Sequence, residues 1–192
     1  MQKFVALAVC IGVVACSGDA PKGVATDTAV IIPGAPVAAA RADTTTRWTL
    51  EENGAGAARV GLTLAELNAD IHETLKMAAG DRAACQMLRS SKFPPGVSIM
   101  VLKDTIQRVD VDSAGVLTPD GFGVGTEEGV VVAALRKRLV IQRHKYDPNG
   151  HYLILPGTTD SVHRIIFETD GRQVTRMRGG VRPAVDQVEK CA

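Results

Sequence analysis

The sequence has few aromatic residues and almost no net charge. Phe, Trp and Tyr make up 4% of its 192 residues, and 22 Lys and Arg balance 21 Asp and Glu to leave a formal charge of +1. This excludes the basic excess that holds a nucleic-acid backbone by counterion release, so no nucleic-acid partner is expected. No apolar run reaches the roughly 18 residues of an ordinary membrane-spanning helix. With 45% hydrophobic residues, a wholly disordered chain is excluded as well.

The sequence also lacks the short motifs that mark common active sites. It contains no Gly-x-Ser-x-Gly nucleophile elbow and no His-Glu-x-x-His zinc motif. The glycine-rich run 121–125 is not followed by the Gly-Lys-Ser/Thr of a phosphate-binding loop. We therefore predict no catalytic residue and no cofactor, and we favour a non-enzymatic role. Acid/base catalysis by residues from distant segments stays open as an alternative.

Residues 110–121 begin like a calcium-binding loop but lack two of its ligands. Ala114 and Gly121 stand where such a loop needs Asp or Asn and a bidentate Glu. We therefore predict no metal site here. Instead we expect the end of a strand, with its valines inward and Arg108 and Asp110 on a solvated face.

The first residues resemble the signal of a bacterial lipoprotein. Lys3 precedes an apolar stretch, 4–14, that is too short to span a bilayer. The tripeptide 13–15 before Cys16 resembles the lipobox, in which the cysteine is acylated and becomes the first residue of the mature chain. We therefore expect removal of 1–15 and attachment of lipid, including palmitate, to Cys16.

Two alternatives to this anchor stay open. In the first, Cys10 is the acylated residue, which is disfavoured because apolar residues follow Cys10. In the second, an ordinary signal peptide is cut nearby. A multiply acylated Cys16 anchors a protein firmly to a membrane. Ser17 after the cysteine is similar to the sorting signal of outer-membrane lipoproteins. We therefore expect a lipid-anchored protein of the cell envelope, in the outer membrane and facing the periplasm, with the inner membrane as the alternative.

The mature chain is expected to consist of a tether and one domain. Residues 16–46 contain three prolines, no aromatic residue and no sustained helical or strand period, which is typical of a flexible tether. Trp48 marks a change in composition, and we predict a single domain over 47–192, which is long enough to bury one core. The apolar patch 30–32 of the tether is interpreted as incidental, with docking on the domain as the alternative.

Two cysteines, Cys85 and Cys191, lie in the predicted domain. An exported chain folds in an oxidising compartment, where two thiols most simply form one disulfide. Neither cysteine has a second cysteine or a histidine at ligand spacing, which disfavours a metal pair or a catalytic thiol. We therefore predict a disulfide that ties the C-terminus to the middle of the domain.

The domain contains an internal repeat, with copies over about 58–115 and 120–180. The first copy opens with Gly61, and Thr63 and Glu66 fit a capping box at the start of a helix. The second opens with Gly123 and Glu128 at the same spacing, and its helix is expected to run to about 137. Strands are predicted after each helix, at 85–89, 97–102 and 105–111 in the first copy and at 138–146, 151–155, 163–168 and 173–178 in the second. This pattern predicts an α+β fold with the helices packed on one face of an antiparallel sheet.

The repeated Gly-x-Thr-x-x-Glu helix opening, the antiparallel strands and the acylated N-terminus resemble a known fold group. It comprises the β-lactamase-inhibitor proteins and the small envelope lipoproteins of the SmpA/OmlA type. The match covers the helix starts at 61–67 and 123–128, and Gly125 replaces the capping Thr in the second. The chain looks equally like an uncharacterised bacterial lipoprotein. The resemblance implies a binding or assembly module rather than an enzyme.

Two histidines beside a predicted turn and two basic clusters lie in the second copy. His144 and His151 flank the predicted turn 147–150, where we expect Tyr146 opposite His151 and a polar surface rather than a metal site. The clusters 136–138 and 143–145 are interpreted as a helix end and a solvated strand, with an anion or partner site as the alternative. The leading functional hypothesis is non-catalytic binding of an envelope protein, and the alternative is binding of a small molecule or glycan.

Overall fold

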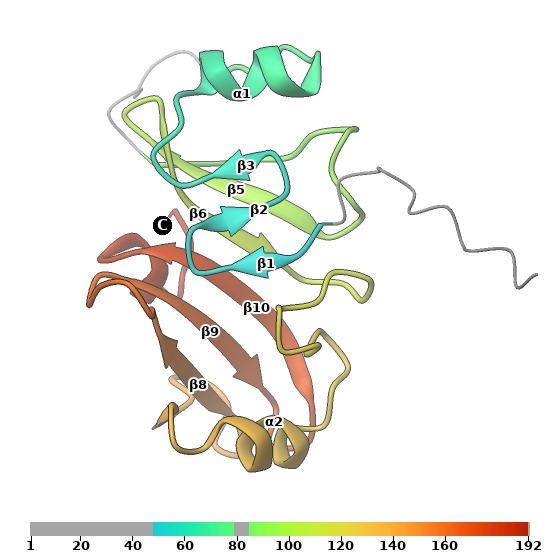
Figure 1. Ribbon diagram of the computed structural model, residues 1–192, viewed down its shortest axis with the longest axis vertical. Coiled ribbons are helices and arrows are strands. Elements are labelled where there is room, and N and C mark those ends of the chain that lie inside the picture. Colours follow the sequence, from blue (N-terminus) through green and yellow to red (C-terminus); the bar gives the residue numbers. More distant parts are fainter. Residues whose placement is uncertain (1–47, 79–84, 192) are drawn as a thin grey trace, which may run out of the picture. The chain divides into compact units, whose positions relative to one another are not determined.

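The structure, a computed structural model, describes residues 48–78 and 85–191. Within these residues the chain forms ten β-strands, two α-helices and a short 3-10 helix (Figure 1). The predicted signal peptide 1–15, the tether 16–46 and Cys16 lie outside the described residues. None of the described helices is long and apolar enough to cross a membrane.

Strand positions agree well with those predicted from the sequence. The seven strands predicted between 85 and 178 are confirmed as β4 to β10, with ends that differ by up to three residues. The strands are β1 (Leu50–Glu51), β2 (Gly54–Ala55), β3 (Ala58–Arg59), β4 (Gln86–Leu88), β5 (Val97–Leu102), β6 (Thr105–Val111), β7 (Val140–Arg143), β8 (His151–Pro156), β9 (His163–Thr169) and β10 (Val174–Val181). The helices are α1 (Leu64–Ile71), α2 (Glu128–Leu135) and the 3-10 helix η1 (Ala184–Asp186).

Two antiparallel meanders form the large sheet, whose strand order is β4-β5-β6-β10-β9-β8-β7. They join where β6 pairs with β10, from Met177 opposite Val111 to Gly180 opposite Arg108. The first predicted copy supplies three of these strands and the second supplies four, and the duplication itself stays a prediction. The two ends of this order make β4 and β7 the edge strands.

The predicted α+β class, with helices packed on one face of the sheet, is wrong. The described chain is mostly β, because a three-stranded sheet, β1-β2-β3, accompanies the large one. The small sheet takes the place expected for the helices: β1 contacts β9 and β10, and β3 contacts β6 (Figure 1). Its strands have two residues each, which is too short a pattern to predict them.

The main hydrophobic core includes side chains from both sheets. Leu50 of β1 is fully buried in one cluster with Phe167 and Met177 of the large sheet. Gly179 allows the close approach of β1, because a Cβ at this position would lie 2.2 Å from the carbonyl oxygen of Glu51. The small sheet therefore covers part of this face, and buried residues of α1 and α2, such as Leu67 and Val131, belong to the same core cluster.

The capping box predicted for the first helix is confirmed. Thr63 is the N-cap of α1: its hydroxyl accepts from the Glu66 N–H at 3.3 Å, and its own N–H donates to Glu66 Oε2 at 2.8 Å. The helix ends at Ile71 because His72 adopts a left-handed conformation, with φ of 52°. Leu75, four positions after the buried Ile71, therefore lies beyond the helix.

Candidate functional site

The second face of the large sheet is apolar on one side and charged on the other, and the end of the chain packs on it. We call residues 182–191 the C-terminal strap. A row of paired residues crosses this face and changes from apolar to charged: Val140, Ile154, Ile166, Arg178, Asp110 and Ser98. The last three are buried, so charged groups lie deep beneath the strap. Val185 of the strap packs in one cluster with Tyr152, Ile154 and Ile166.

Arg108 joins β6 to the C-terminal strap. Its Nε and Nη2 donate to the two carboxylate oxygens of Asp110, at 2.7 and 2.9 Å. Its Nη1 donates to the carbonyl oxygens of Ala184 and Gln187, at 2.8 and 2.6 Å. The expectation that Arg108 and Asp110 face solvent is wrong: both side chains are 1% exposed, because the strap lies over them.

Arg178 on β10 holds the strap in a similar way. Its Nε donates to the carbonyl oxygen of Val185 at 2.7 Å, and its Nη1 donates to Glu168 Oε2 at 3.0 Å. Burial, with the nearby Arg108 as a second cause, lowers the pKa of Arg178, while Glu168 and Asp110 act in the opposite direction. Two buried arginines therefore donate to three carbonyl oxygens of the strap, those of Ala184, Val185 and Gln187.

Glu168 also binds His144, which stacks on Tyr152 with 4.6 Å between the ring centroids. The His144 Nδ1 lies 3.1 and 2.9 Å from the backbone nitrogens of Tyr146 and Asp147. A backbone N–H can only donate, so Nδ1 is the acceptor and Nε2 carries the hydrogen that is donated to Glu168 Oε1 at 3.2 Å. Both ring nitrogens are engaged, which makes His144 a fixed link between turn and sheet rather than a free general base.

The predicted cysteine pair is present at the end of the strap. Cys85, just before β4, and Cys191 form a disulfide with a Cα–Cα distance of 5.1 Å. Lys145 and Tyr146 both bind Glu189, which fastens the strap to the turn after β7. The strap is thus held at its 3-10 helix by arginines and near its end by a disulfide and an ion pair.

A pocket of about 290 Å³ lies between the strap and the β7 half of this face. Its floor is apolar and aromatic, from Tyr152, Ile154 and Ile166, and Gln142 of the edge strand also lines it. Its charged wall contains three arginines and one carboxylate: Arg164, Arg178, Arg182 and Asp186. Arg164 and Arg182 share Asp186, at 3.3 and 2.7 Å, so the wall carries an excess of positive charge.

The edge strand β7 is exposed along its whole length. Val140 is 50% exposed and Ile141 is 48% exposed, although they point to opposite faces of the sheet. The His144 N–H donates to the Gly150 carbonyl at 3.0 Å, and hydrogen-bonded pairs alternate along an antiparallel ladder. The backbone groups of Gln142 therefore face β8, whereas the N–H and C=O of Ile141 and Arg143 point outward, where no described strand pairs with them.

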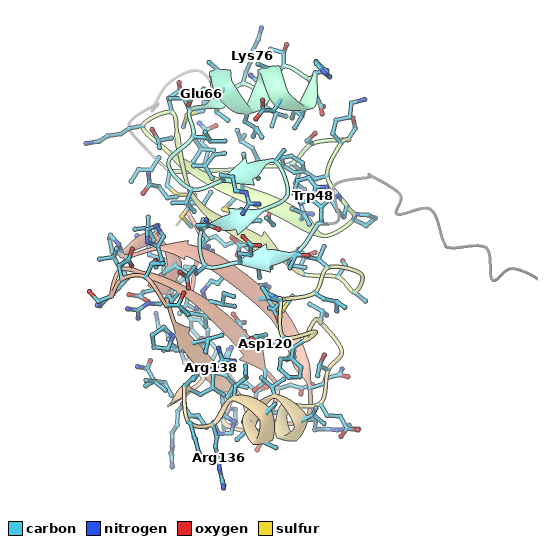
Figure 2. The ribbon with its side chains drawn as sticks, viewed as in Figure 1. Trp48, Glu66, Lys76, Asp120, Arg136 and Arg138 are labelled. Carbon is cyan, nitrogen blue, oxygen red and sulfur yellow. A yellow bond between two sulfur atoms is a disulfide. The ribbon has the colours of Figure 1, made fainter. Side chains whose placement is uncertain are left out.

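Basic residues surround this edge. Arg138 pairs with Asp120 at 2.8 Å and Lys145 pairs with Glu189, but Arg136, Lys137 and Arg143 make no ion pair with any residue that the structure describes. Figure 2 shows Arg136 pointing away from the rest of the domain. The edge thus combines outward backbone groups, two exposed apolar side chains and three cations without a described partner.

His144 and His151 lie in different networks. Arg143, not Tyr146, pairs with His151, so the predicted register of this hairpin is wrong by several residues. His151 Nδ1 lies 3.0 Å from Glu128 at the start of α2, whereas His144 binds Glu168. The described residues contain no group of three or more His, Cys, Asp or Glu that could hold a metal ion.

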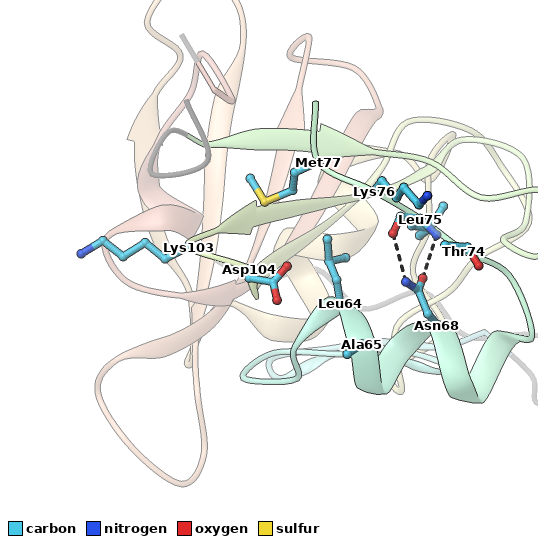
Figure 3. A pocket seen from close by; sticks show the side chains of 9 residues that line it. All are labelled: Leu64, Ala65, Asn68, Thr74, Leu75, Lys76, Met77, Lys103 and Asp104. Atoms are coloured by element: carbon cyan, nitrogen blue, oxygen red, sulfur yellow. Dashed lines mark hydrogen bonds between the residues drawn. The ribbon is translucent and has the colours of Figure 1, made fainter. Parts of the chain in front are cut away.

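A second hollow lies beside α1 and is shown in Figure 3. It has a volume of about 720 Å³ and is lined by Leu64, Met77, Lys103 and Asp104 among others. The Asn68 side chain closes one side, because its amide nitrogen donates to the Leu75 carbonyl at 3.0 Å and its oxygen accepts from the Leu75 N–H at 2.8 Å. Its charged side chains, from Lys76, Lys103 and Asp104, do not converge on a buried point, which makes it a weaker candidate than the pocket under the strap.

Comparison with known proteins gives little guidance. No family model matches this chain, and no curated protein matches it. The crystal structure of the uncharacterized protein yfeY from Escherichia coli is similar over 70% of this chain and 97% of that one, with 12% sequence identity and a TM-score of 0.36. This similarity is too weak to support an inference about fold or function.

Proposed function

We propose that this chain is a lipid-anchored protein of the cell envelope whose domain binds another protein and catalyses no reaction. The anchor is the lipid on Cys16, and the outer membrane is the location that residues 13–17 favour. The relation to small envelope lipoproteins belongs to the same proposal and is supported by these residues and by the helix openings.

The observation that supports protein binding is the difference in exposure between the two edge strands of the large sheet. Soluble proteins usually protect an edge strand by shortness, by charge or by a covering segment, because its free backbone groups pair readily with other chains. At one edge, β4 has three half-buried residues and follows the disulfide at Cys85. At the other, β7 is fully exposed and carries Val140 and Ile141. An edge of this kind supports the addition of a strand from a partner protein.

The proposal is tested by comparing what two variants capture from detergent-solubilised membranes. Ile141→Pro removes an outward N–H, so it blocks strand addition without removing a bond to β8. Val130→Ser removes a side chain on α2 with the same exposure, 49% against 48%, and serves as the matched control. We expect the wild type and Val130→Ser to retain one defined protein that Ile141→Pro loses. Equal capture by all three, or by none, would contradict binding through β7.

A second candidate function, binding of a small molecule or glycan, is favoured by the pocket under the strap. Its apolar floor and convergent arginines are features of ligand sites. A rise in the Tm of the lipid-free protein with a small organic anion, together with no β7-dependent protein partner, would favour this alternative.

A further inference from the structure

We propose that the partner segment at β7 is an extended acidic strand, and that one of its carboxylate side chains enters the pocket under the strap. This inference rests on the proposed function, because it names the chemistry of the partner that binds there. Three features of the domain support it: the outward backbone groups of β7, the cations near this strand and the arginine wall of the pocket.

The ladder geometry fixes which partner residues face the pocket. An added strand would bond to the outward N–H and C=O of Ile141 and Arg143. Its residue opposite Gln142 would then point to the same face as Gln142, with the two Cβ atoms about 5 Å apart. Gln142 lines the pocket, and so do its neighbours Tyr152 and Ile154 on β8. A side chain at that partner position would therefore stand at the pocket, and the backbone would supply the remaining affinity.

The charges around this position select a carboxylate. Arg164 and Arg182 share one carboxylate, Asp186, which leaves one positive charge uncompensated in the wall. Arg178 adds a guanidinium whose Cζ lies 5.4 Å from the centre of the Tyr152 ring, on the β8 side of the pocket. Outside the pocket, Arg136, Lys137 and Arg143 flank the strand without a described carboxylate partner. An acidic side chain at the pocket gains from the arginine wall, and the exposed cations add attraction at longer range, whereas a basic side chain would be repelled.

A second copy of this chain fits the edge less well. Pairing of two β7 strands would bring together two copies of the segment 136–146, which contains five Lys and Arg and no acidic residue. Like charges placed opposite each other destabilise a strand pair. Charge complementarity therefore favours a different, acidic chain.

The test uses the mature chain with Cys16→Ser, so that no lipid is attached and the disulfide is kept. The probe is a short peptide that alternates glutamate and valine, and the control peptide has glutamine in place of glutamate. We expect the glutamate peptide to bind about tenfold more tightly at low salt, with the preference falling as salt screens the charges. Amide shifts in nuclear magnetic resonance should centre on β7 and the strap. Ile141→Pro should lose binding of both peptides.

The contribution of the pocket is tested separately. Arg182→Gln removes one cation of the wall and should abolish most of the preference for glutamate while leaving binding of the glutamine peptide unchanged. Arg172→Gln, in the exposed turn between β9 and β10, is the matched control and should keep the preference.

Four other outcomes would contradict the inference, and each has a different meaning. Equal affinity for the two peptides removes the acidic partner but leaves strand addition intact. Unchanged binding by Ile141→Pro means that the cations attract the peptide without strand pairing. Failure of both peptides, while β7-dependent capture of a membrane protein persists, removes this inference and leaves the proposed function standing. A dimer of the free chain that Ile141→Pro dissociates would assign the edge to a second copy.

Discussion

Arg108 donates a hydrogen bond of 2.8 Å to the carbonyl oxygen of Ala184, a residue 76 positions further along the chain. The same guanidinium binds both oxygens of the buried Asp110. One side chain thus satisfies a charge in the middle of the sheet and holds the strap above it. The strap in turn forms one wall of the pocket, so the stability of this contact and the shape of the candidate site depend on each other.

Replacing Arg108 by Met should destabilise the domain strongly. The substitution leaves the Asp110 carboxylate buried without its partner and removes the arginine donor from two strap carbonyls. Loss of one member of a buried pair costs about 3–5 kcal/mol. The measurement is the free energy of unfolding from urea titration.

The matched control is Arg89→Met, which breaks an ion pair of 2.8 Å with Asp112 at the surface, where the Arg89 side chain is 55% exposed. It should cost less than about 1 kcal/mol. Adding Asp110→Leu to Arg108→Met should restore part of the lost stability, because the uncompensated charge is removed. Similar costs for the two single variants would contradict the role assigned to Arg108.

The disulfide is expected to hold the strap in place independently of the arginine contacts. Mass spectrometry of the non-reduced mature protein should show Cys85 joined to Cys191. Replacing both by Ser should lower the free energy of unfolding by about 4–5 kcal/mol on the chain-entropy model, for a sequence separation of 106. The Arg108 and Arg178 contacts should keep the strap in place in the folded variant. Two free thiols in the wild-type protein would refute this prediction.

The capping box of α1 predicts a local dependence on pH. The backbone N–H of Thr63 donates to the Glu66 carboxylate, and its hydroxyl does so as well, which lowers the pKa of Glu66 below 4.5. The folded state therefore binds this proton less readily than the unfolded state. The resulting stabilisation is fully present above pH 4.5 and is lost as the pH falls through the folded-state pKa.

A titration of the Glu66 carboxyl group by nuclear magnetic resonance checks this. Thr63→Val keeps the backbone N–H but removes the hydroxyl, so it should raise the pKa part of the way back. A wild-type Glu66 that titrates at its ordinary value would show that the capping box is not formed in solution.

The sequence predicted the elements of the large sheet better than their arrangement. The sequence pattern placed β5 and β6 to the residue, although both strands bury side chains on their two faces. It did not reveal that β1, β2 and β3 cover the sheet, since two-residue strands have no period to detect. The fold class was therefore wrong even though most elements were right.

The candidate site was likewise predicted from the sequence only in part. The Cys85–Cys191 pair followed from cysteine number and compartment, and the basic clusters around β7 were visible as an alternative reading. Burial of Arg108 and Asp110 was not predictable, because an Arg and an Asp two positions apart on a strand look the same whether water or a distant strap covers them. The signal that pointed to the strap was the disulfide itself, which requires the C-terminus to lie near β4.

The membrane anchor is tested by Cys16→Ala. Without an acylated cysteine the protein should move from the membrane fraction to the soluble fraction after cell lysis. Cys10→Ala is the matched control and should leave the protein in the membrane fraction. A Cys16→Ala protein that stays membrane-bound would contradict the lipid anchor.

Binding of a partner through β7 is tested most directly by photo-crosslinking in intact cells. A photoreactive amino acid is placed at Ile141 in one variant and at Val130, which is equally exposed, in another. We expect one discrete crosslinked protein from position 141 and none from position 130. No crosslink from position 141, or the same crosslinks from both positions, would contradict binding through β7.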